Sequence, residues 1–170
     1  MAGRYPQPIV VDTTVLSNFA STDSISFLIA VLESPMVVPA VRDELKRGLD
    51  TGHDYLDTAV DALSDELPVR PLSSDRDSQH IRERLNLGEA ESLLAAIEYD
   101  GTLATDDLAA REVADQRDVP VTGSIGLLVL GIEHDHIDRE TADEWLETWR
   151  EQRGYYAPVE SVTEILGSEE

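Results

Sequence analysis

The 170-residue sequence predicts an α/β fold, a three-layer α/β/α sandwich around a mostly parallel central sheet. Two observations predict it. Short continuous apolar runs, typical of strands buried on both faces, alternate along the chain with segments whose apolar residues recur at helical spacing. Acidic residues stand where such runs end, at the place where parallel α/β sheets open a crevice. We therefore expect one domain over residues 1–170, with residues 139–166 as a C-terminal helical extension.

The first half of the chain opens with the apolar run 8–11, which predicts a buried strand. Helices are expected over 13–19 and 24–32. The apolar residues 36–38 predict the next strand, and Pro39 after it favours a first helical turn. The other elements expected here are a helix over 41–47, a break over 48–52, an amphipathic helix over 55–67, and an edge strand over 69–72 that contains proline.

The second half repeats the alternation of strands and helices. We expect helices over 77–85, 88–99 and 106–116, strands over 102–105 and 119–121, and a further helix that starts at 122–124. A last helix over 139–152 carries Trp145 and Trp149 four residues apart on one face, which predicts that this face packs on the body of the protein.

The charge of the chain is strongly acidic. It has 35 acidic against 13 basic residues, a net charge of -22, and Lys46 is its single lysine. This composition resembles that of a salt-adapted proteome, although such a charge ordinarily disfavours a polyanionic partner. At molar salt the Debye length falls to ~3 Å, so surface repulsion is screened and a local cationic contact can still act.

The absence of cysteine excludes a disulfide framework, a thiolate zinc site and a thiol nucleophile. Any bound metal must therefore be held by oxygen or imidazole. No apolar stretch reaches the ~20 residues of a membrane span, and the N-terminus lacks the apolar segment of a secretory signal. We expect a cytoplasmic protein with no membrane partner.

Five acids are the candidate catalytic and metal-binding residues. They stand at the end of an apolar run or on the inward side of the helix that follows one, and they are Asp12, Glu44, Glu89, Asp106 and Asp107. Carboxylates gathered in one crevice repel each other unless divalent cations lie between them. This pattern indicates metal-assisted chemistry.

Each acid also has a structural explanation. Asp12 can cap the following helix, and Glu89 can form a capping box with Asn86. Glu44 can extend along its helix to solvent. The two adjacent aspartates are favoured at a helix start by the dipole alone, by about 0.3–1 kcal/mol each.

The motifs around these acids resemble those of the PIN domain family of metal-dependent ribonucleases. The matching stretches, which span nearly the whole chain, are IVVDTTVL at 9–16, VPAVRDEL at 38–45, LGEAESLL at 87–94, LATDDLAAR at 103–111 and VTGSIG at 121–126. The matches fall in order on the family's four acidic regions. The third region here has glutamate, where common members have aspartate.

The resemblance implies an endoribonuclease in which the five acids bind Mg²⁺ or Mn²⁺ ions and these ions bind the scissile RNA phosphate. Residues expected to support this centre are Thr13, Ser17, Asn18, Glu91 and Thr122. Many relatives of this type are toxins encoded beside an antitoxin, so an antitoxin protein is an expected partner. A homodimer is also expected.

Other acidic α/β enzymes fit less well. Phosphoacceptor receivers and haloacid-dehalogenase-like phosphatases need a lysine near the later strands, whereas Lys46 comes early. Residues 12–14, Asp-Thr-Thr, also lack the second aspartate of the phosphatase motif. The alternative from a different functional class is a PIN-like module that binds RNA or protein without cleaving it.

Overall fold

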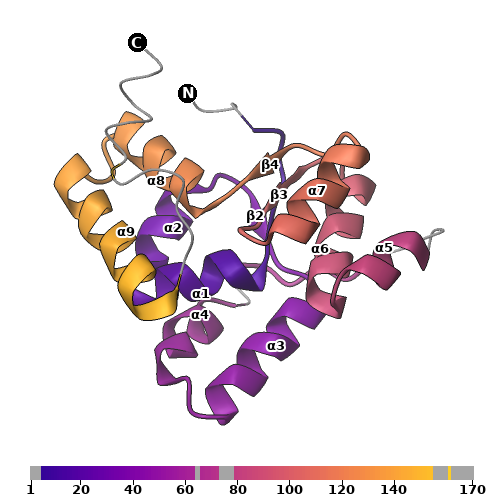
Figure 1. The fold of residues 1–170 in the computed structure, drawn as a ribbon, viewed down its shortest axis with the longest axis horizontal. Coiled ribbons are helices and arrows are strands. Elements are labelled where there is room, and N and C mark those ends of the chain that lie inside the picture. Colours follow the sequence, from indigo (N-terminus) through magenta and orange to yellow (C-terminus); the bar gives the residue numbers. More distant parts are fainter. Residues whose placement is uncertain (1–4, 64–65, 73–78, 155–160, 162–170) are drawn as a thin grey trace.

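The central sheet has four strands in the part of the chain that the computed structural model describes, which is residues 5–63, 66–72, 79–154 and 161. All four are parallel, in the order β2-β1-β3-β4. They are β1 (Ile9–Val11), β2 (Pro35–Met36), β3 (Thr102–Ala104) and β4 (Val121–Thr122). Figure 1 shows the strands between two groups of helices, so the predicted three-layer α/β/α arrangement is confirmed.

The helices of each group pack against one another. One group consists of α1 (Thr13–Ser21), α2 (Ile25–Val31), α8 (Ser124–Glu133) and α9 (Arg139–Arg153). In the other, α6 (Leu87–Glu98) lies on β1 and β3 and joins α3 (Pro39–Asp50), α5 (Gln79–Arg84) and α7 (Leu108–Gln116). A short 3-10 helix, η1 (Asp54–Leu56), and α4 (Asp57–Ala62) connect α1 with α3.

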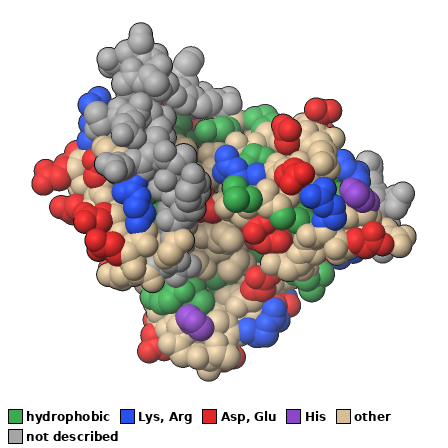
Figure 2. Space-filling model, viewed as in Figure 1, with side chains coloured by type: hydrophobic (Ala, Val, Ile, Leu, Met, Phe, Trp, Pro, Cys, Tyr) green, Lys and Arg blue, Asp and Glu red, His purple; other side chains and the backbone are tan. Residues whose placement is uncertain are grey.

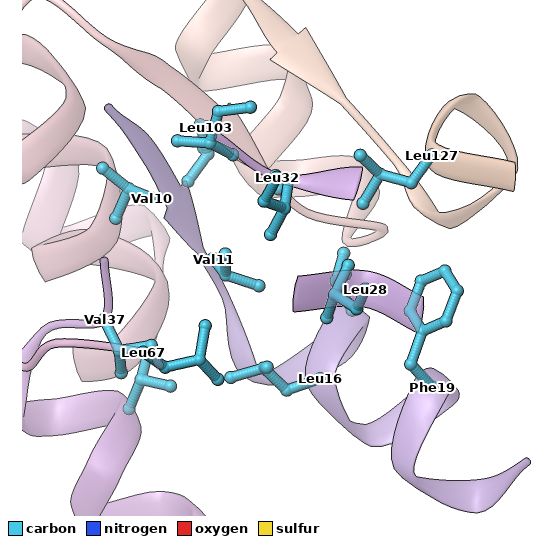
Figure 3. Close-up of a cluster of buried hydrophobic side chains, with 14 of the residues drawn as sticks. Val10, Val11, Leu16, Phe19, Leu28, Leu32, Val37, Leu67, Leu103 and Leu127 are labelled. Carbon is cyan, nitrogen blue, oxygen red and sulfur yellow. The ribbon is translucent and has the colours of Figure 1, made fainter. Parts of the chain in front are cut away.

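The apolar core lies on both faces of the sheet. Figure 3 shows Val10 and Val11 of β1 pointing to opposite sides, with Val11 directed toward the helices that carry Leu16 and Leu28. All four side chains are fully buried. Burial on both faces explains why the strands appear in the sequence as continuous apolar runs and not as an alternation of apolar and polar residues.

The break predicted over 48–52 is shorter in the structure, because α3 continues through Gly48 and ends at Asp50, and the turn is limited to Thr51 and Gly52, where Gly52 has a φ of 103°. Gly48 lies inside the helix, where its backbone packs against Leu56. A β carbon at this position would lie 2.6 Å from Cδ1 of Leu56, so the glycine makes room for η1. This glycine therefore lies at a close contact within the helix and not at a turn.

The helix predicted over 55–67 is shorter in the structure, where it divides into η1 and α4 and ends at Ala62. The edge strand predicted over 69–72 is reduced to one isolated bridge between Val37 and Val69. The helix predicted over 77–85 is described from Gln79, since residues 73–78 lie outside the described ranges.

The last helix, α9, confirms the predicted packing of the two tryptophans. Trp149 is fully buried, meets Phe19 edge-on at 5.0 Å between ring centroids, and donates its indole N–H to the Asn18 carbonyl at 2.7 Å. Trp145 meets Phe27 in the same way at 5.2 Å. Gly154 ends the helix with a φ of 64°. Of the predicted extension over 139–166, residues 155–160 and 162–166 fall outside the described part.

None of the helices in the described ranges combines the length and apolarity needed to cross a bilayer.

We expect Trp149→Phe to lower the free energy of unfolding by about 1–2 kcal/mol, because it removes one buried hydrogen bond and part of the buried ring. Trp149→Ala should lower it by about 3–5 kcal/mol. Urea unfolding followed by circular dichroism measures both values. The matched control is Trp145→Phe at the partly buried tryptophan on the same helix, which should change stability by less than Trp149→Phe; an equal loss would contradict the role given to the indole hydrogen bond.

Candidate functional site

The strand order reverses between β1 and β3. From β1 the chain proceeds to β2 on one side of the sheet, and from β3 it proceeds to β4 on the other. Open α/β sheets bind ligands outside the carboxyl ends of the strands at such a switch point. Asp12 follows β1 here, and the segment Thr105–Asp106–Asp107 follows β3. The ladder pairs Val11 with Ala104, and the Asp12 N–H donates to the Ala104 carbonyl at 2.9 Å, so the two segments leave the sheet side by side.

Asp12 lies at the bottom of this switch point and is only 1% exposed. Its Oδ1 accepts the Thr13 N–H at 2.8 Å, and its Oδ2 accepts the hydroxyls of Thr105 at 2.7 Å and Thr14 at 3.3 Å. Burial raises the pKa of Asp12 from its ordinary 3.8 to about 6, and the nearby Glu44 carboxylate adds to the rise. Asp12 therefore caps α1, which is the structural role that the sequence suggested. It is also a buried carboxyl group close to another acid, Glu44.

Glu44 reaches the switch point from α3. Its Oε2 accepts the Thr13 hydroxyl at 3.2 Å, and the Asp12 carboxylate is its electrostatic neighbour. The Glu44 carboxylate occupies the space that a β carbon on Gly88 would fill, at the start of α6. Only glycine at 88 leaves this room. The neighbouring Asp43 and Lys46 on α3 are exposed, so Glu44 is the member of this stretch that turns inward.

Glu89 has both of the roles that the sequence suggested. It forms the capping box with Asn86: its N–H donates to Asn86 Oδ1 at 2.9 Å, and its Oε1 accepts the Asn86 N–H at 3.2 Å. Burial raises the pKa of Glu89 from 4.5 to about 7, and the Asp107 and Asp12 carboxylates raise it further. A hydrogen bond with Asp107 acts in the same direction. Two carboxyl groups can bond in this way only when one of them carries a proton.

The two adjacent aspartates point to different partners. Asp107 caps α7, accepting the Ala110 N–H at 2.8 Å, and lies against Glu89. The Asp106 carboxylate is directed toward the start of α8, where Oδ1 accepts the Ser124 N–H at 2.8 Å and Oδ2 accepts Nδ2 of Asn18 at 2.9 Å. The Ser124 hydroxyl also donates to Oδ2. Asp107 thus belongs to the acidic cluster, and Asp106 connects three segments beside it.

Two of the expected supporting residues contact the acids directly: Thr13 bonds Glu44, and Asn18 bonds Asp106. Ser17 is buried in α1, Thr122 is buried at the end of β4, and Glu91 is half-buried farther along α6. The sequence-based reasoning missed Thr105, Ser124 and the packing role of Gly88. Thr105 is completely buried between Asp12 and the start of α7, where its Oγ1 also accepts the Asp107 N–H at 3.2 Å. Its position directly after an apolar run was the available signal.

A comparison with known families agrees with this geometry. The sequence model of one family, described as PIN domain, matches residues 8–170. The chain belongs to the PIN domain family. Members of this family are typically nucleases and generally use divalent metal ions. A search of curated proteins gave no match.

The chemical type of the acidic side chains in this PIN domain suits a hard divalent cation. Asp12, Glu44, Glu89 and Asp107 offer carboxylate oxygens, which Mg²⁺ and Mn²⁺ prefer, and burial together with neighbouring carboxylates raises the pKa of Asp12 and Glu89, which a bound cation would lower again. Nevertheless, within the described residues no three His, Asp or Glu side chains are grouped tightly enough to form a complete ligand set. A bound Mg²⁺ keeps several waters and needs few direct carboxylates, so a looser arrangement is compatible with its chemistry.

One cation of the PIN domain lies close to the acids. The half-buried Arg111 on α7 donates from Nη1 to the Thr105 carbonyl at 3.1 Å, and the same Nη1 lies near Gly123 beside Asp106. Figure 2 shows acidic, basic and hydrophobic side chains interspersed on the side of the molecule formed by α5, α6 and α7. The surroundings of the site therefore do not form a continuous basic patch on this face.

We expect the metal-free PIN domain to lose stability as the pH rises from about 4 to about 7. In the unfolded chain Asp12 and Glu89 titrate near 3.8 and 4.5, whereas in the folded state their pKa values are about 6 and about 7. Between these limits the folded state retains protons that the unfolded state has released, so the free energy of unfolding falls with rising pH. The shift at Asp12 alone corresponds to a loss on the order of 3 kcal/mol.

Urea unfolding at constant ionic strength, in buffers with a chelator, measures this dependence. Asp12→Asn should remove a large part of the fall, while Asp57→Asn at an exposed position of α4 should leave it unchanged. A pH profile of Asp12→Asn that is identical to the wild type would contradict the burial of this carboxyl as its cause.

Proposed function

We propose that this PIN domain is a Mg²⁺- or Mn²⁺-dependent endoribonuclease that hydrolyses RNA phosphodiester bonds. The observation that supports the proposal most strongly is the approach of Asp12, Glu44, Glu89 and Asp107 to one another at the sheet switch point, where burial, with repulsion between neighbouring carboxylates added, raises the pKa of Asp12 and Glu89. Such a cluster is stabilised by a divalent cation, and the family match supports a nuclease.

The four acids have distinct roles in this proposal. Asp12, held by Thr105 and Thr14, and Glu44, which reaches the same place from α3, would hold the metal through their carboxylate oxygens. Glu89 and Asp107 would complete the ligand set, and Glu89, whose pKa is raised by burial and by the Asp107 carboxylate, would release its proton to bind a cation there. The bound metal would lower the pKa of an attacking water and stabilise charge on the phosphate oxygens. Asp106, with Asn18 and Ser124, holds the loop that presents Thr105 and Asp107.

The biological setting is also part of the proposal. The motif resemblance supports a cytoplasmic toxin paired with an antitoxin protein and a homodimeric assembly. The composition, with 35 acidic residues and one lysine, supports adaptation to high salt. High salt screens the repulsion between this surface and RNA, which is why cleavage is best assayed in concentrated KCl.

One observation favours a second candidate function. Because the described residues contain no complete metal-ligand set, a PIN module that binds RNA or a partner protein without cleaving it is the alternative. The two candidates differ in whether phosphodiester cleavage depends on both the metal and Asp12.

We expect Asp12→Asn to reduce cleavage at least 100-fold while the protein remains folded, since the change removes one ligand charge and also relieves carboxylate repulsion. The assay uses purified protein, Mn²⁺ and labelled RNA in multimolar KCl, together with a chelated sample. Asp57→Asn is the matched control and should cut like the wild type. Equal cleavage by wild type and Asp12→Asn would identify a contaminating nuclease, and no cleavage by either would favour the binding module.

The two adjacent aspartates allow a sharper test of the site. Asp107→Asn should weaken Mn²⁺ binding at least 10-fold, because Asp107 faces the cluster. Asp106→Asn should change Mn²⁺ affinity less than about 3-fold but lower the free energy of unfolding by about 1–3 kcal/mol, because it disturbs a network of three donors. Electron paramagnetic resonance of free Mn²⁺ and urea unfolding measure the two properties. Equal losses of metal affinity in both variants would show that Asp106 is also a ligand.

A further inference from the structure

Arg111 is a cation held in contact with the acidic site. It projects from the first turn of α7, and its side chain is half-buried. Its Nη1 donates to the Thr105 carbonyl at 3.1 Å, and the hydroxyl of the same Thr105 donates to Asp12 Oδ2 at 2.7 Å. One residue, Thr105, therefore joins the guanidinium group to the Asp12 carboxylate of the proposed metal site.

Gly123, directly after β4, makes room for this guanidinium group. A β carbon at 123 would lie 2.6 Å from Nη1 of Arg111 and 2.7 Å from Oδ1 of Asp106. Real β carbons essentially never make contacts this short, so a larger residue at 123 would displace one of these two groups. The guanidinium group thus lies between the Thr105 carbonyl on one strand end and the Gly123 backbone on the next.

The guanidinium group of Arg111 keeps donors to spare. It carries five N–H donors, and in the described part of the chain the Thr105 carbonyl is its one hydrogen-bond partner. No described carboxylate forms an ion pair with it either, whereas the nearby Arg84 pairs with Glu112 at 3.6 Å. In a chain with 35 acidic and 13 basic residues, a half-buried arginine next to acids but without an ion pair is unexpected. Its spare donors suit an anion that comes from outside the chain.

The order of charges along the sheet edge indicates which anion this is. The strands are ordered β2-β1-β3-β4, and the groups that follow them in the same order are Glu44, Asp12, Asp107 and, over Gly123, Arg111. Carboxylates therefore occupy three strand ends and a guanidinium group the fourth. The carboxylates repel a phosphodiester wherever no metal ion lies between them, and a fixed guanidinium group offsets that repulsion. Its planar fork also matches the oxygens of a phosphate group.

We propose that Arg111 binds a backbone phosphate of the RNA substrate at the β4 end of the acidic site. The inference rests on the proposed ribonuclease function and adds a substrate-binding residue to it. A contact with phosphate fixes the position of the RNA without reading its bases. Arg111 therefore contributes equally to the binding of RNAs of different sequence.

RNA binding is measured by fluorescence anisotropy in the non-cutting Asp12→Asn background, with Mn²⁺ and concentrated KCl. Arg111→Gln should weaken the binding of labelled RNAs about 10-fold, whatever their sequence, because it removes a charge-assisted contact with phosphate. Arg111→Lys should recover part of the loss, since it restores the charge without the fork. The matched control is Arg117→Gln, which removes the same charge from the exposed far end of α7 and should bind RNA like the parent.

A second measurement separates a phosphate contact from a purely structural role of Arg111. A series of RNAs is prepared in which one phosphate at a time is replaced by an uncharged methylphosphonate. The parent should bind one of these RNAs about 10-fold more weakly than the unmodified RNA, and Arg111→Gln should bind the two equally, because both changes remove the same contact. An arginine that only supports the fold would give additive losses and a lower melting temperature, and this result would overturn the inference.

The inference and the proposed function can fail separately. Equal binding of RNA by the parent and Arg111→Gln would overturn the inference, while metal-dependent cleavage that requires Asp12 would still support the ribonuclease. An absence of RNA binding by the parent, together with an absence of cleavage by the wild type, would overturn both.

Discussion

The structure of the site depends on a buried carboxylate at the end of β1. Asp12 can remain there because the parallel register of β1 and β3 places Thr105 directly beside it, and Thr105, Thr14 and the Thr13 N–H supply hydrogen bonds in place of water. These bonds favour the charged form, whereas burial and Glu44 oppose it more strongly, so the pKa rises. The sheet thus holds the Asp12 carboxyl group in a fixed position, although burial disfavours its charged form.

Local backbone structure at the start of α6 allows Glu44 and Glu89 to come close to Asp12. Gly88 leaves room for the Glu44 carboxylate at the start of α6, and the capping box with Asn86 fixes the backbone from which Glu89 projects. Capping and chemistry are therefore compatible uses of the same glutamate. Apart from Glu44, which lies within α3, the acids of the site stand at helix starts and strand ends, where unpaired backbone N–H groups can stabilise negative charge. This arrangement explains why several acids tolerate one another before any cation binds.

The sequence contained enough information to predict the strands and the inward acids, because both follow from local patterns: continuous apolar runs and the helical spacing of Glu44 and Glu89. It could not separate Asp106 from Asp107, since their difference depends on partners 88 and 18 residues away, Asn18 and Ser124. The break predicted at Gly48 failed for a similar reason. Gly48 packs against Leu56, and this contact cannot be seen in the sequence. A glycine considered from the sequence alone suggests a turn.

The network around Asp106 explains why an acid stands there. Its two oxygens face the amide of Asn18, the N–H of Ser124 and the hydroxyl of Ser124, and a carboxylate can accept from all three. An amide has a single acceptor oxygen and would turn its NH₂ group toward one of these donors. The Asn18 carbonyl in turn accepts the indole N–H of Trp149, so the chain of hydrogen bonds extends from the last helix, α9, to the loop that carries Thr105 and Asp107. The packing of α9 and the geometry of the acidic cluster are consequently parts of one connected structure, although Asn18 and Trp149, which join them, are 131 residues apart in the sequence.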